Sequence, residues 1–145
     1  MPRPTTFHSA SVAQTKVLGK NFGKNIRTGA ILALAGPFGG GKTTFVQGLA
    51  SGVRLGRKIV SPTFVKMASY AIPNTDRRFY HLDLFHLRSR SEFRELGLSE
   101  ILKNTRDIVI IEWPEKVKAW LPPRTHWIHF AHDPKNAKTR IIQIR

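Results

Sequence analysis

The residues with the clearest chemical role lie between Gly36 and Thr43, where the sequence reads GPFGGGKT and matches the pattern GxxxxGK[ST]. In that pattern the glycines let successive backbone N–H groups point at phosphate oxygens, the lysine bridges the outer phosphates, and the hydroxyl binds Mg²⁺. The pattern therefore predicts a site for ATP or ADP with Mg²⁺; the alternative is a glycine-rich turn that precedes a lysine. The expected nucleotide-binding residues are Gly36, Phe38, Gly39, Gly40, Gly41, Lys42, Thr43 and Thr44.

Two of the nine carboxylates differ from the rest because each follows an apolar run typical of a buried strand. Asp83 follows FYHL and Glu112 follows IVII, so both are expected at strand ends that face the phosphate loop. There they would hold Mg²⁺ together with Thr43 or orient an attacking water, which makes both candidates for catalytic and metal-binding residues. The competing interpretations are an N-cap or an ion pair with Arg88 for Asp83, and a surface ion pair for Glu112.

The elements that would position these residues follow from the spacing of apolar side chains. Residues 30–35, AILALA, predict a strand buried on both faces, followed by a glycine-rich turn over 36–41 and a helix over 42–49. The phosphate loop thus has the strand, loop and helix context that it requires. Pro37 lacks a backbone N–H, so the donors of the loop are expected from Phe38 onward. Ser9 or Ser11 is expected to cap an earlier helix that ends near residues 28–29.

The second half of the chain predicts further strands and short helices. Strands are expected over 65–71 and 78–84 around a turn, over 108–111, and as a closing hairpin over 126–131 and 140–144. Ser91 and Ser99 are expected to cap short helices, and another short helix is expected over 115–121. Interleaved strands and helices predict an α/β fold, a three-layer P-loop NTPase-like domain with a mixed, mainly parallel central sheet and antiparallel additions. Because no linker or repeat divides the chain, residues 1–145 are expected to form a single domain.

Charge and composition exclude several classes of protein. With 24 Lys and Arg against 9 Asp and Glu the net charge is +15, and no carboxylate precedes Asp76. This surplus fits a protein that works beside a polyanion such as RNA, or a source whose proteins are all basic. The chain has no cysteine, which excludes disulfides, thiolate metal sites and cysteine nucleophiles. The longest apolar run, residues 30–35, is too short to cross a bilayer, so a cytoplasmic protein is expected.

Several motifs in a fixed order resemble the TsaE (YjeE) family of P-loop ATPases, which acts in bacterial tRNA threonylcarbamoyladenosine synthesis. The similarity covers most of the chain and begins with an N-terminal helix that carries Thr15 and Gly19. The motifs that follow are GPFGGGKTTF at 36–45, SPTF at 61–64, Tyr70, HLDLF at 81–85, LGL at 96–98 and IEWPEK at 111–116. A phosphate loop alone is shared by a superfamily, whereas the joint order of SPTF, HxD and IEWPE is far more specific.

The resemblance implies a role for each matching position. Lys42 and Thr43 match the phosphate- and magnesium-binding residues, Asp83 the catalytic or metal-associated acid, and Glu112 a second acid near magnesium, while Trp113 would lie beside the site. A mobile switch segment would be formed by Ser61, Pro62, Thr63 and Phe64. Family members are weak ATPases that bind a TsaD and TsaB pair, and their ATP turnover supports the cycling of that complex. Contact with tRNA is expected through the complex, and no membrane is implied.

The sequence departs from the family pattern where Pro37 replaces the usual acid, Gly40 the usual alanine, and Phe85 with His86 the usual tyrosine and arginine. A neutral histidine cannot offer phosphate the charge of an arginine, and Arg88 or Arg90 are the nearby replacements. Two other functions remain open from the residues alone. One is a small-molecule P-loop kinase, which needs an acceptor site and an arginine-bearing lid. The other is an RNA-binding module for which the nucleotide is only a structural ligand.

Overall fold

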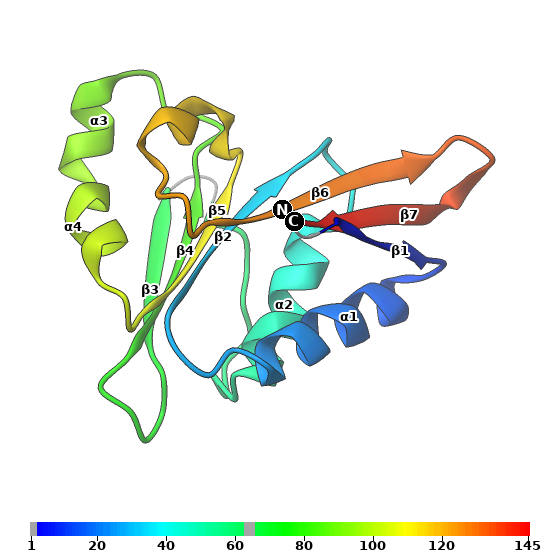
Figure 1. Ribbon diagram of the computed structural model, residues 1–145, viewed down its shortest axis with the longest axis horizontal. Helices are drawn as coiled ribbons and strands as arrows, with labels where there is room; N and C mark the ends of the chain where they lie inside the picture. The colour runs from blue at the N-terminus through cyan, green and yellow to red at the C-terminus, as the bar shows by residue number, and fades with distance from the viewer. Residues whose placement is uncertain (1–2, 63–65) are drawn as a thin grey trace.

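A seven-stranded sheet forms the centre of the protein in a computed structural model that describes residues 3–62 and 66–145 (Figure 1). The strand order is β1-β7-β6-β2-β5-β4-β3. The strands are β1 (Thr5–Ser9), β2 (Ala30–Ala35), β3 (Met67–Ala71), β4 (Arg78–Asp83), β5 (Ile108–Glu112), β6 (His126–Asp133) and β7 (Asn136–Ile144). Strands β6, β2, β5 and β4 run parallel at the centre, and the outer pairs β1–β7, β7–β6 and β4–β3 are antiparallel. This mixed sheet confirms the predicted fold class.

Helices cover both faces of the sheet and complete the three layers. The helices are α1 (Val12–Lys24) and α2 (Lys42–Gly52) in one layer, and α3 (Arg90–Glu95), α4 (Leu98–Lys103) and the 3₁₀ helix η1 (Pro114–Trp120) in the other. Each layer encloses its own apolar core, because β2 directs Leu32 and Leu34 to the α1–α2 side and Ile31 to the opposite side. Within the described ranges, no helix is long and apolar enough to span a membrane.

The central strands β2 and β5 are buried along their whole length, as uniformly apolar runs at the centre of a parallel sheet require. Their register pairs Leu34 with Glu112. On the other side of β5, the register pairs Asp83 of β4 with Glu112. Parallel strands end at the same edge of the sheet, so this register brings the two acids side by side next to the loop that follows β2.

Glycines allow α1 and α2 to pack at an unusually short distance. The glycine seam consists of Gly19 and Gly23 on α1 and Gly48 and Gly52 on α2. A Cβ atom at Gly48 would lie 2.1 Å from the main-chain oxygen of Lys16, and one at Gly19 would lie 2.2 Å from a main-chain oxygen of α2. Any larger residue in the seam must therefore push the two helices apart, because close-packed backbone leaves it no other space.

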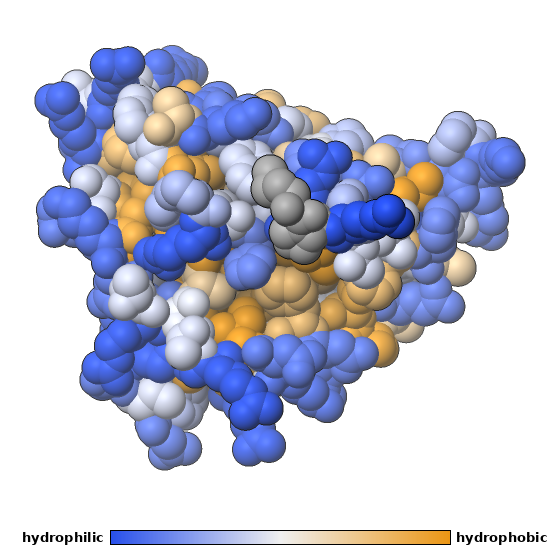
Figure 2. All heavy atoms as spheres, viewed as in Figure 1, coloured by the Kyte–Doolittle hydropathy of each residue, from blue (hydrophilic) through white to orange (hydrophobic). Residues whose placement is uncertain are grey.

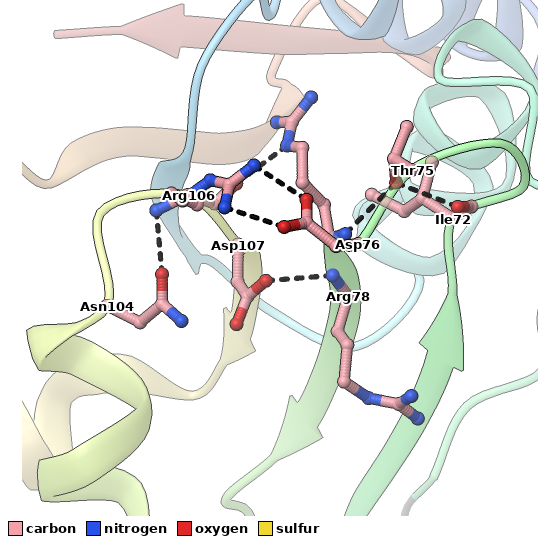
Figure 3. Close-up of polar contacts among 8 residues, drawn as sticks. Ile72, Thr75, Asp76, Arg78, Asn104, Arg106 and Asp107 are labelled. Carbon is pink, nitrogen blue, oxygen red and sulfur yellow. Dashed lines mark hydrogen bonds and ion pairs between the residues drawn. The ribbon is translucent and has the colours of Figure 1, made fainter.

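The edge of the sheet opposite the two acids is held together by ion pairs and hydrogen bonds (Figure 3). Both terminal nitrogens of Arg106, in the loop before β5, donate to the Asp76 carboxylate in the β3–β4 turn, at 2.7 and 2.6 Å. The backbone N–H of Arg78 donates to Asp107 Oδ1 at 2.8 Å. The carboxylate of Asp76 therefore already has a cationic partner from the neighbouring loop.

The N-terminal region differs from its prediction in two ways. Strand β1 is missing from the predicted elements, because its sequence TTFHS is short and largely polar and its partner β7 lies at the far end of the chain. Ser9 ends this strand, and Ser11, the other expected cap, accepts a hydrogen bond from the backbone N–H of Gln14. Helix α1 ends at Lys24, earlier than predicted, where the Asn25 side chain donates to a main-chain oxygen of the last turn.

The later helices also begin at other residues than predicted. Ser89, and not Ser91, caps α3, and Gly97, and not Ser99, precedes α4. Gly97 has a left-handed φ of 69°, a conformation that glycine adopts without strain. The helix predicted over 115–121 is the 3₁₀ helix η1, which follows Trp113 in a left-handed conformation.

Apart from β1, each strand of the sheet was predicted, but the lengths differ. The two strands of the closing hairpin extend further toward the turn than predicted, and Asp133 accepts the backbone N–H of Lys135 within that two-residue turn. Strand β3 begins at Met67, and the first predicted position of that strand, Val65, lies outside the described residues.

Candidate functional site

The glycine-rich loop connects the buried strand β2 to helix α2, as predicted. Gly36, Gly39 and Gly41 all have positive φ angles, of 142°, 72° and 98°. Gly41 is the N-cap of α2, so the loop leads directly into the positive end of a helix of 11 residues. A turn of this kind, at a helix start, presents backbone N–H groups to an anion.

Two departures from the family pattern, Pro37 and Gly40, lie close together within this loop. The N–H of Gly40 donates to the main-chain oxygen of Pro37 at 3.2 Å. A Cβ atom at Gly40 would lie 3.0 Å from that same oxygen. The loop that contains Pro37 therefore leaves little room for the alanine usual at the position of Gly40.

The side chain of Lys42 is held inside the loop. Its Nζ donates to the main-chain oxygen of Gly36 at 2.7 Å and lies 3.7 Å from the centre of the Trp113 ring. Burial lowers the pKa of Lys42 from its usual 10.5, and the nearby Glu112, Glu115 and Asp83 carboxylates oppose that shift. The ammonium group is thus placed among oxygen and aromatic partners that a phosphate can replace.

Both predicted carboxylates are buried and line the same cleft as Lys42. Asp83 is 5% exposed and Glu112 is 3% exposed. Oδ1 of Asp83 accepts the N–H of Phe85 at 3.0 Å, and Oδ2 accepts the hydroxyl of Ser61 at 3.2 Å. These contacts differ from the N-cap and the Arg88 ion pair considered for Asp83, and they fix the carboxylate at the end of β4.

His81 holds the second carboxylate. Its Nε2 lies 2.7 Å from Oε2 of Glu112, and both side chains are buried. Among the described residues, Nδ1 of His81 has no hydrogen-bond partner. A neutral ring with its hydrogen on Nε2 therefore donates to Glu112 and leaves no buried N–H without an acceptor. The interpretation of Glu112 as a surface ion pair is wrong, because its partner lies in the core.

The cleft around these groups has a volume of about 310 Å³. Its predicted lining residues are Phe38, Gly39, Gly41, Lys42, Thr43, Thr44, Ser61, Asp83, Glu112 and Trp113. Gly36 and Gly40 lie in the same loop without being part of this lining. The structure therefore brings the phosphate loop, both acids and Trp113 together around one cavity.

The sequence analysis missed five lining residues, from two elements. The first turn of α1 and its cap supply Ser11, Val12 and Thr15, and strand β7 supplies Lys138 and Arg140. Nε of Arg140 donates to the main-chain oxygen of Gly39 at 2.9 Å. Lys138 and Arg140 reach the loop through the strand order, because β7 pairs with β6, which lies next to β2, whereas the α1 residues reach it through the packing of α1 on α2.

At Phe85 and His86, where the family pattern has tyrosine and arginine, the segment places an aromatic ring beside the cleft residues Phe38 and Trp113 and no arginine. The ring of Phe85 lies 4.8 Å from that of Phe38 and 5.1 Å from that of Trp113, measured between ring centres. His86 is exposed, and Arg88 and Arg90 line a different pocket beside α3. The cationic residues that line the cleft in the described chain are instead Lys42, Lys138 and Arg140.

The predicted switch segment is described only in part. Ser61 lines the cleft and Pro62 is buried, whereas Thr63 and Phe64 lie outside the described residues. The described half of the segment therefore begins at the cleft, next to Asp83.

Comparison with known proteins bears on the fold and the family. A family model described as "Threonylcarbamoyl adenosine biosynthesis protein TsaE" matches residues 9–142. The tRNA threonylcarbamoyladenosine biosynthesis protein TsaE of Treponema pallidum is 36% identical over 117 residues, which cover 81% of this chain and 84% of that protein. The protein of the same name from Bacillus subtilis is 32% identical over 112 residues, 75% and 66% of the two chains. The crystal structure of Bacillus subtilis YdiB matches with a TM-score of 0.71 at 23% identity, over 99% of this chain and 86% of that one, a likeness of fold.

Proposed function

The chain belongs to the TsaE family and takes part in tRNA threonylcarbamoyladenosine biosynthesis, and from this premise we propose that it binds ATP with Mg²⁺ and hydrolyses it slowly. The resemblance stated from the sequence motifs is thereby confirmed at the level of the family. One observation supports the proposal most directly: the phosphate loop, Lys42 and two buried carboxylates surround a single cleft.

Phosphate binding would proceed by exchange of partners at Lys42. The ammonium group now donates to Gly36 and lies against the face of Trp113. A nucleotide phosphate would offer the ammonium an acceptor of full opposite charge, an attraction that the uncharged carbonyl of Gly36 does not provide. The positive end of α2 and the backbone N–H groups of the loop would favour the same anion.

The residues at the inner wall of the cleft fit a magnesium site. Mg²⁺ takes oxygen ligands, and this wall offers the hydroxyl of Thr43 and the carboxylates of Asp83 and Glu112. When bound, the ion would neutralise charge on the transferred phosphoryl group. His81 holds Glu112 in place through its hydrogen bond, so this carboxylate needs little reorganisation to act.

For hydrolysis we assign Asp83 and Glu112 to the orientation of the attacking water. Both acids end parallel strands beside the loop, where the outer phosphate would lie. The water adds to the outer phosphorus, the bond to the ADP oxygen breaks, and a carboxylate accepts the proton that the water loses. Phe38 and Trp113 line the cleft and Phe85 packs against both rings, so this aromatic cluster would limit the access of further water.

The resemblance to TsaE ATPases also supplies the proposed partners. We propose that TsaD-like and TsaB-like proteins bind this chain, and that ATP turnover supports the cycling of their complex on tRNA. The transfer of threonylcarbamoyl would belong to the TsaD-like partner. Work on tRNA would take place in the cytoplasm.

The test compares Lys42→Ala with Lys135→Ala, a change to an exposed lysine in the β6–β7 turn. Isothermal titration with Mg²⁺ and ADP should show at least roughly ten-fold weaker binding for Lys42→Ala, since a lost charge-assisted hydrogen bond costs about 1.5 to 3 kcal/mol. Lys135→Ala should bind normally. Unchanged affinity in a folded Lys42→Ala variant would refute the phosphate-loop assignment.

A turnover assay tests the partners. ATP hydrolysis is measured for the protein alone, with a TsaD and TsaB pair, and with tRNA added separately. Stimulation by the pair alone supports the proposed role, whereas transfer of phosphate to a small acceptor would indicate a kinase.

A further inference from the structure

The two helical layers differ in charge. Every carboxylate of the chain follows residue 75, so α1, α2 and the loop after α2 contain basic residues and no acid. The opposite layer, from α3 to η1, contains both signs, with Glu92, Glu95, Glu100 and Glu115 among its lysines and arginines. Of the two helical layers, the α1–α2 layer therefore carries the larger excess of positive charge.

The basic row consists of Lys16, Lys20 and Lys24 on α1 and Arg54 just after α2, all exposed. The three lysines recur every four residues, so they follow one face of the helix at intervals of about 6 Å along its axis. Lys24 and Arg54 line the same surface pocket, which continues the row from α1 to the end of α2.

The glycine seam fixes the position of this row. A Cβ at Gly48 or Gly52 would meet the main-chain oxygens of Lys16 and Lys20, which places the backbone of both lysines directly against α2. The row therefore runs along a seam between two helices in close contact, and does not project from a flexible loop.

No carboxylate neutralises the row within the described chain. The ion pairs there use Lys66, His81, Lys103 and Arg106. Asp76, in the turn beside the pocket of Lys24 and Arg54, is already paired with Arg106 (Figure 3). Like charges four residues apart destabilise an isolated helix, so a polyanion would remove an unfavourable interaction here.

Exposed apolar residues of α1 lie beside the basic row, toward β1. Val12 and Val17 are 64% and 57% exposed, and Val17 borders a groove between α1 and β1. Figure 2 shows apolar surface over the part of α1 toward β1 and hydrophilic residues along the lower rim of the molecule. The row presents four exposed cations in succession, and cations of this kind favour a partner recognised by charge.

We propose that the basic row binds the phosphate backbone of an RNA. Regularly spaced cations on a rigid surface match the regular spacing of phosphates along an RNA chain. Binding of this kind requires neither a pocket nor base-specific contacts. Biosynthesis of a modified tRNA brings such a polyanion to the protein. The inference goes beyond the proposed ATPase function, because the nucleotide cleft does not include the row.

The experiment measures binding of an unmodified tRNA transcript to the full chain by fluorescence anisotropy, over a range of KCl concentrations and without nucleotide. The variant combines Lys16→Gln, Lys20→Gln and Lys24→Gln. The charge-matched control combines Arg94→Gln, Lys103→Gln and Lys118→Gln, exposed residues of the opposite layer. Thermal unfolding and ADP titration of both variants check the fold and the nucleotide site.

Loss of three phosphate contacts should lower the slope of log K against log salt by roughly 2 to 3 and weaken binding on the order of 10²-fold at 0.1 M salt. The control should retain most of its affinity and ADP binding should stay normal in both. Equal losses in the two variants would overturn the proposal, because net charge alone would then explain binding.

Two other results also bear on the row. Absence of tRNA binding by the parent protein would overturn the proposal, as would a basic-row variant that lost only its binding to the TsaD and TsaB pair. A parent protein that binds tRNA through the row but fails to bind ADP would refute the ATPase function and leave this inference standing.

Discussion

Substitution of Gly48 by alanine should destabilise the protein, although alanine is the better helix former. A Cβ atom at Gly48 would lie 2.1 Å from the main-chain oxygen of Lys16, where ordinary contact begins at 3.4 Å. The obstacle is backbone, so it cannot rotate aside as a flexible side chain would. Helices α1 and α2 must therefore separate by about 1.3 Å or distort locally, and the packing along the glycine seam is lost.

The expected magnitude is the difference between two opposing effects. Overpacking typically costs about 1 to 3 kcal/mol, and a rigid backbone obstacle places Gly48 near the upper end. Replacing a glycine inside a helix by alanine stabilises the helix by about 1 kcal/mol, which opposes that cost. The free energy of unfolding should therefore fall by about 2 kcal/mol.

Urea unfolding followed by circular dichroism measures this change. With an m value of about 2 kcal/mol/M, the midpoint of Gly48→Ala should fall by about 1 M urea. The control is Ser51→Ala, an exposed position on the same helix, which should leave the midpoint unchanged within about 0.3 M. A Gly48→Ala protein as stable as its parent would show that the two helices can separate without cost, and the close packing would then not stabilise the fold.

Two further predictions concern the cleft. Asp83→Asn keeps the shape of the side chain and removes its charge. With saturating Mg²⁺ and partner we expect near-normal ATP affinity but hydrolysis reduced by roughly 10²-fold, the scale for loss of a positioned acid–base group. Full hydrolysis by this variant would move the catalytic role to Glu112 or to a partner residue. Because burial lowers the pKa of Lys42 below 10.5, its ammonium loses the proton at a lower pH than a free lysine, and ADP affinity should fall as the pH rises through that lowered pKa. The decline should disappear in Lys42→Ala, and an affinity that stays constant up to pH 10.5 in the parent would contradict it.

The parts of the site that could be predicted from the sequence are those set by local pattern. The glycine-rich loop between an apolar run and a helix identified Lys42 and Thr43, because that motif needs no information from distant residues. Asp83 and Glu112 were expected at the loop because parallel strands end at the same edge of a sheet. Their roles in metal binding and catalysis stay predictions.

The remaining parts depend on contacts between distant segments. The hydrogen bond of His81 to Glu112 follows from the register of β4 on β5, which the amino-acid pattern does not specify. Thr15 and Arg140 line the cleft only because α1 packs on α2 and β7 joins the sheet through β6. The spacing of residues along the chain does not reveal the order of the strands or how closely the two helices pack.

The pairing of β1 with β7 has a consequence for the order in which the protein folds and opens. Thr5 lies opposite Ile144, so this pair closes a loop of almost the whole chain, whereas the β6–β7 hairpin forms from neighbouring residues. Closing a longer loop costs more entropy, so β1 should dock late in folding and detach early in local opening. The hydroxyls of Ser9, at the end of β1, and Thr15, in the wall of the cleft, lie 2.7 Å apart and share a hydrogen bond. A ligand that orders this wall would therefore slow hydrogen exchange of the β1 amides, and fraying of β1 would loosen the wall on which the ligand rests.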